Sequence, residues 1–355
     1  MKPHDSGGPS AEPPQAGPHP KGHEAAPSGP GGSGAVPGER GAVSSSGPSA
    51  GPPQAGPHPP GGSGAVPGER GVVINALTVD VEDYFQVSAF APHIARSDWA
   101  RRECRIEANV ERILALLATA DTKATFFTLG WIAERYPALV RQIVAAGHEL
   151  ASHGCDHERA SELSPAAFAQ DIGRAKALLE DIGGARVQGY RAPSFSIGAG
   201  NLWAFDALAR AGYRYSSSLY PVRHDHYGMP EAPRFAHRRG ELLEIPPTTL
   251  RLAGRNLPAS GGGYFRLLPY ALSRWMLAQV NRVEGEAAVF YFHPWELDPT
   301  QPRIAGIGRK TQFRHYLNLH RTEARLTRLL ADFRWGRMDR IFLDPAQSTG
   351  SAAAG

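Results

Sequence analysis

The chain has 355 residues, a formal net charge of +4 and two cysteines. A small positive charge without Lys/Arg runs argues against nucleic-acid binding, and two cysteines cannot build a disulfide framework. No apolar run of about 18 residues is present to cross a membrane, and no apolar segment follows Met1 as in a signal peptide, so the sequence predicts a cytoplasmic protein.

The first 70 residues differ in composition from the rest. They hold 17 of the 40 glycines, 16 of the 31 prolines and no Trp, Tyr or Phe. Such a segment cannot bury enough apolar surface to offset the entropy lost on ordering. We therefore predict a disordered Pro/Gly-rich tail over residues 1–71, a folded region over 72–342 and a short flexible tail over 343–355.

The folded region alternates between two hydrophobic patterns. Short runs of β-branched, aromatic and leucine residues predict strands at 73–79, 124–129, 148–151, 187–190, 242–245 and 288–292. Apolar residues at helical spacing predict helices at 109–120, 137–146, 165–182, 201–211, 269–283 and 315–333. Ser164 is a candidate N-cap and Gly183 a candidate stop for the third helix. The alternation predicts an α/β fold, either a parallel sheet or a (β/α) barrel, with functional groups at the carboxyl ends of the strands.

Three acidic residues follow the first predicted strand. Asp80, Glu82 and Asp83 lie within four consecutive positions. Carboxylates this close repel one another unless a cation or a proton lies among them. The segment is therefore a candidate metal or acid–base site, with an ordinary acidic loop as the alternative.

Two histidines follow the third predicted strand. His153 and His157 are spaced as i and i+4, which would place both rings on one face of a helix. Imidazole suits Zn, Co, Ni or Fe, and two histidines with one carboxylate form a facial ligand set that leaves positions for water and substrate. We expect these histidines to join the acidic segment in a metal site.

Two later strand ends carry further polar groups. Arg191 follows the strand at 187–190, and His293 follows the strand at 288–292. Pro294 fixes the backbone after His293, and Trp295 flanks it. A histidine and a tryptophan in this place suit a general acid or a surface on which a sugar ring stacks.

The order of these motifs resembles the polysaccharide deacetylase superfamily, also called NodB homology or carbohydrate esterase family four. An Asp-bearing first strand, an S-H-x-x-x-H pair, an R-x-P and a late strand ending in His occur in sequence from Leu77 to His293. The phrases VDVEDYFQVSAF, HELASHGCDHE, GYRAPSFSI and FYFHPWELD are most similar to deacetylases of exosortase/PEP-CTERM exopolysaccharide loci. The resemblance implies a distorted (β/α) barrel with a C-terminal extension from about residue 221.

The resemblance also implies catalytic roles. Asp80 matches the general base, Arg191 the arginine that orients the base, and His293 the general acid. The backbone amide near Ser194 is expected to hold the oxyanion, and Trp295 is expected to contact the sugar.

A divalent metal, Zn with Co or Ni as alternatives, is implied as the cofactor. His153 and His157 match its histidine ligands. Val81 stands where many members have a second Asp directly after the base, so the acidic ligand is either Glu82 or Asp83, and we favour Asp83.

One family feature is missing. Many members carry an Asp after the next strand that pairs with the catalytic histidine or arginine, whereas this chain has Ser216, Ser217 and Ser218 in that segment. Serine cannot supply charge, and Glu296 or Asp298 is the candidate replacement.

The implied activity is metal-dependent hydrolysis of N-acetyl groups on the amino sugars of a polysaccharide, a carbon–nitrogen hydrolase acting on linear amides in exopolysaccharide biosynthesis. The expected partner is the N-acetylated polysaccharide. Two alternatives stay open: an allantoinase-like amidohydrolase of the same fold acting on a small non-carbohydrate amide, and an inactive glycan-binding module.

Overall fold

The computed structural model of the chain describes residues 72–224 and 228–344. These residues belong to the unit Val66–Gly355. The predicted N-terminal tail, and the predicted C-terminal tail from residue 345 onward, lie outside the described residues. Asp339–Leu343 forms a π-helix and the described residues end at 344, so the described structure extends two residues past residue 342, the predicted end of the folded region.

The described residues form two β-sheets. One contains nine strands, and a separate hairpin contains two. The strands are β1 (Ile74–Val81), β2 (Thr125–Thr128), β3 (Glu149–Ser152), β4 (Gly189–Tyr190), β5 (Tyr215–Ser216), β6 (His237–Arg239), β7 (Leu242–Glu244), β8 (Thr249–Leu252), β9 (Arg255–Pro258), β10 (Val289–Phe292) and β11 (Arg334–Gly336).

Helices separate the strands along the chain. The α-helices are α1 (Ile106–Thr119), α2 (Gly130–Arg135), α3 (Pro137–Ala145), α4 (Pro165–Gly183), α5 (Ala204–Arg210), α6 (Gly262–Leu267), α7 (Tyr270–Gln279), α8 (Arg309–Tyr316) and α9 (Thr322–Asp332). Three short 3-10 helices, η1 (Tyr84–Gln86), η2 (Ser88–Phe90) and η3 (Arg96–Arg101), link β1 to α1. Three more, η4 (Pro193–Phe195), η6 (Pro294–Leu297) and η7 (Leu319–Arg321), lie further along the chain.

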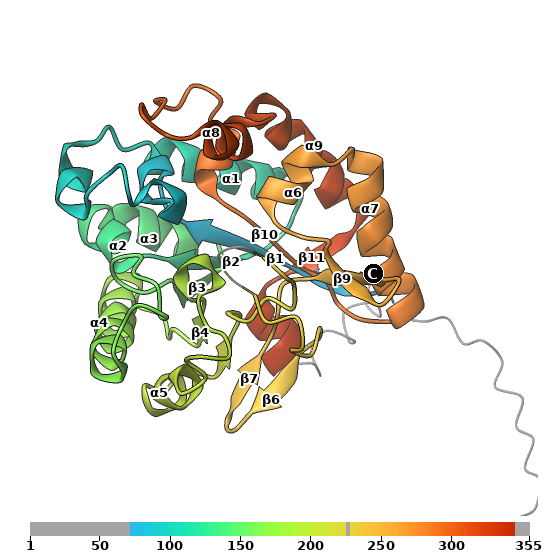
Figure 1. Ribbon diagram of the computed structural model, residues 1–355, viewed down its shortest axis with the longest axis horizontal. Helices are drawn as coiled ribbons and strands as arrows, with labels where there is room; N and C mark the ends of the chain where they lie inside the picture. The colour runs from blue at the N-terminus through green and yellow to red at the C-terminus, as the bar shows by residue number, and fades with distance from the viewer. Residues whose placement is uncertain (1–71, 225–227, 345–355) are drawn as a thin grey trace, which may run out of the picture. The chain divides into compact units, whose positions relative to one another are not determined.

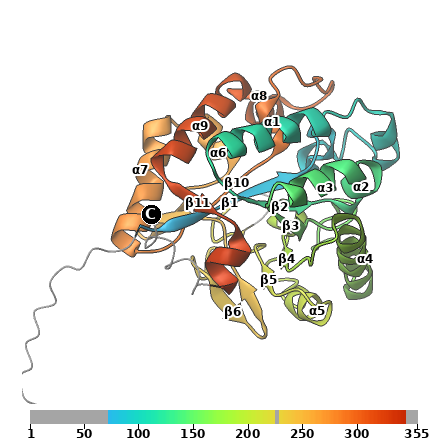
Figure 2. The ribbon, with the colours of Figure 1, turned by 180° about the vertical axis from the view of Figure 1, so that it is seen from behind.

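The large sheet confirms the predicted α/β class. Its strand order is β10-β1-β2-β3-β4-β5-β7-β6, with β11 paired to β1, and its pairs are parallel apart from β6 with β7. Over the described residues the path does not close from β6 back to β10, so the sheet is a curled, open barrel. Figures 1 and 2 show β1 between β2 and β10, the strand at one end of this order.

The predicted ends of the long helix α4 are confirmed. The Ser164 hydroxyl accepts a hydrogen bond from Ala167 N at 3.2 Å, and Pro165 occupies the first turn, where no backbone donor is needed. At the other end Gly183 is the last helical residue, and Gly184 takes the left-handed conformation (φ 60°). Phe168, Ile172, Ala175 and Leu179 face the core at helical spacing.

The sequence prediction is wrong at the C-terminal helix. A single helix was expected over 315–333, but α8 ends at Tyr316 and α9 starts at Thr322. Asn318 has φ 53° between them, a left-handed conformation that breaks the helix. Strands β5, β6, β8, β9 and β11 were also missed, because segments of two to four residues carry too little periodicity to detect.

The carboxyl ends of β1, β3, β4, β5 and β10 lie at one edge of the sheet, because these strands are parallel. Side chains that follow these strands are thereby brought together from positions more than 200 residues apart in sequence. Among the described residues, no helix is long and apolar enough to cross a bilayer.

Candidate active site

Asp80 and Arg191 form a buried ion pair at this edge. Arg191 Nη1 donates to Asp80 Oδ1 at 2.6 Å and to Thr78 Oγ1 at 2.8 Å, and both charged side chains are almost fully buried. The guanidinium also stacks on Phe127, with Cζ 4.1 Å from the ring centroid. Since Oδ1 is taken by the arginine, the second oxygen of Asp80 is left to face the site, where His293 Nε2 lies 3.9 Å away.

Three serines at the end of β5, Ser216 to Ser218, hold the segment of Arg191 in place. Ser217 accepts from Arg191 twice, through its carbonyl oxygen at 3.2 Å and its hydroxyl at 2.9 Å. Ser218 Oγ accepts from Ala192 N at 2.9 Å, and Ser216 Oγ hydrogen-bonds to Ser218 Oγ. Neutral acceptors are sufficient here, because Asp80 supplies the negative charge.

Glu82, His153 and His157 bring three ligand atoms within 4.8 Å of one another. Glu82 lies directly after β1, and strand alternation places it on the same face as Asp80. His157 Nε2 lies 2.6 Å from Glu82 Oε2, and both side chains are only 4% exposed. The rings of His153 and His157 are 5.3 Å apart.

The donor set fits a divalent metal. Glu82 Oε2 is buried, and apart from His157 Nε2 at 2.6 Å it makes no hydrogen bond among the described residues. A buried carboxylate oxygen and an imidazole nitrogen that face each other this closely are a donor pair that a divalent metal can bind. His153 Nδ1 donates to the Arg191 carbonyl at 2.9 Å, which orients the ring and leaves the lone pair of Nε2 available to a metal. Burial lowers the pKa of His153 to about 4 despite the nearby carboxylates, so the ring is neutral, as a ligand must be.

The two histidines do not share a helical face, which corrects the expectation from their spacing. Residues 153–157 form a loop in which Gly154 has φ 77° and His157 has φ 54°. The loop is held by hydrogen bonds from Gly130 N to the Gly154 carbonyl and from Cys155 N to Asp171 Oδ1, at 2.9 and 3.0 Å. These two left-handed residues, not helical periodicity, turn both rings toward Glu82.

The structure places Asp83 away from the histidines, which corrects our preference for it as the acidic ligand. Asp83 caps η1: its Oδ1 accepts from Tyr84 N at 2.7 Å, and its own N–H donates to Gln86 Oε1. Its Oδ2 accepts from Arg105 N at 2.5 Å and from Cys104 Sγ at 3.0 Å. Both oxygens are occupied, and the acidic position beside the histidines belongs to Glu82, the alternative.

His293 lies close to the carboxylates of Glu82 and Glu296. Its Nε2 lies 3.5 Å from Glu82 Oε1, and its Nδ1 is 2.7 Å from Glu296 Oε1. Burial opposes the charged ring, but the carboxylates of Glu82, Glu296 and Asp80 outweigh it and raise the pKa of His293 to about 9. The side chain is 21% exposed, so a proton on Nε2 can meet a ligand from outside.

Glu296 takes the place of the missing family Asp. Its contact with His293 Nδ1 fixes which ring nitrogen faces the site. Asp298, the other candidate, turns away: its Oδ1 accepts from the backbone and hydroxyl of Thr300 at 2.9 and 2.7 Å.

Trp295 is buried, with 5% exposure, and cannot serve as an open surface for a sugar ring. It stacks between His293 and His315, at ring-centroid distances of 5.2 and 4.2 Å. Its Nε1 donates to Glu82 Oε1 at 3.3 Å. The prediction of direct substrate contact is corrected, since Trp295 packs behind His293 and Glu82. Sequence reasoning missed His315, whose place in this stack no local motif indicates.

Ser194 lies in the loop after β4, next to the site. Ser194 and Phe195 both have positive φ, 55° and 51°. Non-glycine residues adopt this conformation at a cost and often do so at functional sites. The Ser194 hydroxyl hydrogen-bonds to Ser88 Oγ at 2.6 Å, which ties the loop to η2. The role of its amide as an oxyanion donor stays a prediction.

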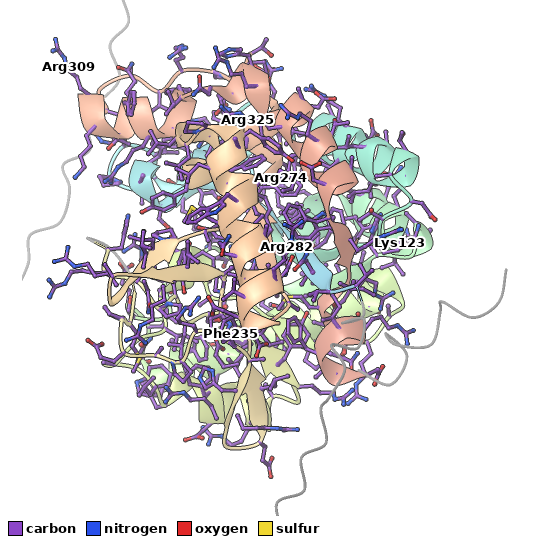
Figure 3. The ribbon with its side chains drawn as sticks, turned by 90° about the vertical axis from the view of Figure 1, so that its right-hand side faces the viewer. Lys123, Phe235, Arg274, Arg282, Arg309 and Arg325 are labelled. Atoms are coloured by element: carbon purple, nitrogen blue, oxygen red, sulfur yellow. The ribbon has the colours of Figure 1, made fainter. Side chains whose placement is uncertain are left out.

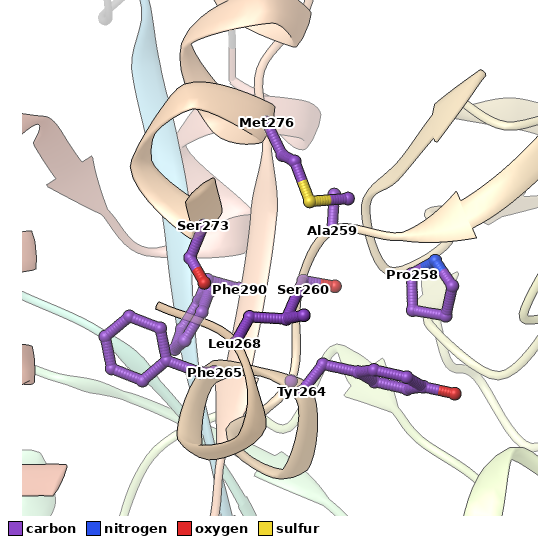
Figure 4. Close-up of a pocket in the computed structure, with 10 residues that line it drawn as sticks. Pro258, Ala259, Ser260, Tyr264, Phe265, Leu268, Ser273, Met276 and Phe290 are labelled. Carbon is purple, nitrogen blue, oxygen red and sulfur yellow. The ribbon is translucent and has the colours of Figure 1, made fainter. Parts of the chain in front are cut away.

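A small apolar hollow lies between β9, α6 and α7 (Figure 4). Its lining includes Phe265, Leu268, Met276 and Phe290, and it has no room for a water molecule. None of the residues proposed above for catalysis or metal binding lines this hollow, so it does not compete as the active site.

Comparisons with known proteins agree with the geometry. Residues 99–216 match the polysaccharide deacetylase family, and residues 217–343 match a domain of unknown function, DUF3473. His153, His157 and Arg191 fall in the first segment, whereas His293 and Glu296 fall in the second. The polysaccharide deacetylase match thus covers about a third of the chain, and the candidate site also draws on residues before and after the matched segment.

Curated relatives match over part of their length. A peptidoglycan deacetylase-like protein of Gibberella zeae is 33% identical over 108 residues, 30% of this chain and 31% of the relative. A peptidoglycan deacetylase of Helicobacter pylori is 28% identical over 118 residues (32% and 38%), and a chitooligosaccharide deacetylase of Azorhizobium caulinodans 29% over 133 residues (37% and 60%). The chain therefore spans about a third to three fifths of these proteins.

Among solved structures, one assigned as a polysaccharide deacetylase of Mycobacterium smegmatis superposes with a TM-score of 0.51 at 21% identity. It covers 78% of this chain and 91% of the other. This likeness shows the fold: a curled parallel sheet of the NodB-homology type, as the sequence resemblance implied.

Proposed function

We propose that this chain, which matches the polysaccharide deacetylase family over residues 99–216, is a metal-dependent hydrolase that removes N-acetyl groups from amino sugars of a polysaccharide. The observation that carries the proposal is the convergence of a buried base, a three-atom ligand set and a charged histidine at one sheet edge. Asp80 and His293 face each other across 3.9 Å, and Glu82 lies beside both Asp80 and the histidine ligands.

The base and the acid have distinct environments. Arg191 binds Oδ1 of Asp80 and so leaves Oδ2 to take a proton from an attacking water. His293 carries a proton at neutral pH, because its pKa is raised to about 9, and donates it from Nε2 to the leaving amine. The carbon–oxygen bond to water forms, the carbon–nitrogen bond breaks, and acetate and a free amino sugar result.

Glu82, His153 and His157 would hold the divalent metal, Zn or alternatively Co or Ni. When bound, the metal supplies Lewis-acid polarisation of the acetyl carbonyl and lowers the pKa of water. We expect the backbone amide of Ser194, which lies in a left-handed conformation, to add a hydrogen bond to the developing oxyanion.

The substrate class follows from the relatives and the sequence resemblance. Relatives named as peptidoglycan and chitooligosaccharide deacetylases support an N-acetylated glucosamine polymer. The phrases shared with deacetylases of exosortase/PEP-CTERM loci favour an exopolysaccharide, and the reaction would then be a step in its biosynthesis.

Acetate release from N-acetylglucosamine oligomers tests the activity. We expect the full chain to release acetate. Acetate release should stop after chelation of the metal and recover when zinc or cobalt is added. His153→Ala should stay inactive with added metal, because one ligand atom is lost. Folded, metal-loaded protein that hydrolyses a small ureide or amide but releases no acetate from the oligomers would favour the allantoinase-like alternative. Oligomer binding without hydrolysis of either substrate would favour a glycan-binding module.

The buried position of Trp295 gives a separate prediction. Trp295→Phe removes the hydrogen bond to Glu82 Oε1 and keeps an aromatic ring beside His293. We expect kcat to fall about three- to tenfold, the equivalent of one hydrogen bond of about 0.5–1.5 kcal/mol, with KM unchanged. A rise in KM at constant kcat would mean that Trp295 contacts the sugar after all.

A further inference from the structure

The residues that fix the catalytic histidine come from the region of unknown function. His293 is oriented by Glu296, and both oxygens of that carboxylate are engaged. Oε1 meets the Nδ1 and the backbone N–H of His293, at 2.7 and 3.1 Å. Oε2 accepts from Nε of Arg266 at 2.6 Å.

Arg266 is the counter-charge of Glu296. It lies in α6, is 2% exposed and forms an ion pair with a carboxylate that is fully buried. Its Nη1 donates to the carbonyls of His315 and Leu317, both at 2.8 Å, and the guanidinium lies 5.3 Å from the Trp295 ring centroid. These two carbonyls at the end of α8 therefore hold the guanidinium of Arg266 in the orientation that reaches Glu296.

Gly262 provides the space for the carboxylate. A Cβ atom on Gly262 would lie 2.0 Å from Glu296 Oε1 and 2.1 Å from Oε2, so the carboxylate rests directly on the backbone at the start of α6. The helix itself is fixed to the core, since Phe265 packs edge-on against Phe290 with ring centroids 5.1 Å apart (Figure 4). Any group larger than hydrogen at position 262 must displace Glu296.

We propose that Arg266 and Gly262 are positioning residues that hold Glu296 against Nδ1 of His293. This inference rests on the proposed function and deepens it, because it gives the 217–343 region a part in the reaction. A buried carboxylate that loses its counter-charge is costly, and Glu296 would then reorient or take up a proton. His293 would lose the partner of its Nδ1 and with it the ring orientation that aims Nε2 at the leaving group.

The glycine pair gives a matched test. Gly262 and Gly263 are neighbours in α6, neither needs a positive φ, and alanine favours a helix at both positions. A Cβ on Gly263 meets nothing within 4 Å. We expect Gly262→Ala to lower kcat about 10- to 100-fold, the range found when a residue that supports a functional side chain is replaced. Gly263→Ala should leave kcat unchanged.

The arginine pair separates positioning from folding. Arg325, labelled in Figure 3, is a second arginine near α6. It donates to the carbonyls of Phe265, Arg266 and Leu268 but makes no described contact with Glu296. Arg266→Met and Arg325→Met both remove hydrogen bonds from a guanidinium to backbone carbonyls around α6. We expect only Arg266→Met to lower kcat, about 10- to 100-fold with KM unchanged.

A double-mutant cycle tests whether Arg266 acts through Glu296. Glu296→Gln alone should lower kcat, and adding Arg266→Met to it should lower kcat little further, since the carboxylate that the arginine holds is gone. Fully additive losses would show that Arg266 acts elsewhere and would overturn the proposal.

An activity-independent measurement keeps this inference separate from the proposed function. In ¹⁵N-edited spectra, the His293 Nδ1–H proton, assigned with His293→Gln, should lie downfield in the wild-type chain and in Arg325→Met. It should shift or disappear in Arg266→Met and Gly262→Ala. If the wild type never releases acetate but these shifts occur, the function fails and the positioning stands. An unchanged proton in both variants overturns the positioning.

Discussion

Asp80→Asn is expected to lower kcat by about 10²- to 10⁴-fold, the range for loss of a general base, while binding of N-acetylglucosamine oligomers is retained. The amide oxygen can still accept from Arg191 Nη1, now 2.6 Å from Asp80 Oδ1, but it cannot take a proton from water. Stopped-assay acetate release gives kcat, and oligomer binding is measured by calorimetry. Retained turnover would remove Asp80 from the mechanism.

The effect of Asp80→Asn on stability needs a separate control, because its ion-pair partner Arg191 is fully buried. Loss of one partner of a buried ion pair costs about 3–5 kcal/mol, so part of any effect of Asp80→Asn could come from unfolding. Thr78→Ala removes a different acceptor of the same Nη1, at 2.8 Å, and leaves the carboxylate in place. We expect it to lower the melting temperature and to keep most of kcat. Equal losses of activity in the two variants would assign the effect to Arg191 placement.

Glu82→Gln is expected to weaken metal binding more than about 100-fold, because one of the three ligand groups becomes a neutral amide. This exceeds the loss of about 10- to 100-fold found when a residue that only supports a ligand is replaced. Zinc binding is measured by competition with a chromophoric chelator. Burial raises the pKa of Glu82, but the neighbouring imidazoles of His157 and His293 outweigh it and hold that pKa below its usual range, which favours the anion a metal requires.

Asp83→Asn is the matched control at the next position. Asparagine still caps η1, but the carboxylate that accepts from Arg105 N and Cys104 Sγ is lost. We expect a loss of about 1–2 kcal/mol in the free energy of unfolding, with metal affinity within tenfold of wild type. The reverse pattern, strong metal loss in Asp83→Asn and little in Glu82→Gln, would restore the original preference for Asp83.

The choice between Glu82 and Asp83 was predictable from two features of the sequence. Strand alternation puts Glu82, not Asp83, on the same face as Asp80. Asp83, with Gln86 three residues later, forms a capping box, in which its side chain accepts a hydrogen bond from the backbone. The placement of polar groups at strand ends was correct because it depends only on parallel pairing.

Other features could not be found from local patterns. The loop conformation at Gly154 and His157 depends on contacts with α2 and with Asp171, so spacing alone suggested a helix. Arg266 reaches Glu296 from 30 residues away, and the run Gly261 to Gly263 was interpreted as a flexible connection. Burial of Trp295 follows from stacking on His315, a contact set by the tertiary fold.

The most direct test of the central claim is to measure both products from one reaction. Full chain loaded with zinc is incubated with N-acetylglucosamine oligomers, and acetate and primary amine are quantified together. The proposed chemistry predicts equal amounts of the two, with neither formed by Asp80→Asn. Acetate without an equal amount of new amine, or no acetate from folded and metal-loaded protein, would contradict hydrolysis of the N-acetyl group at this site.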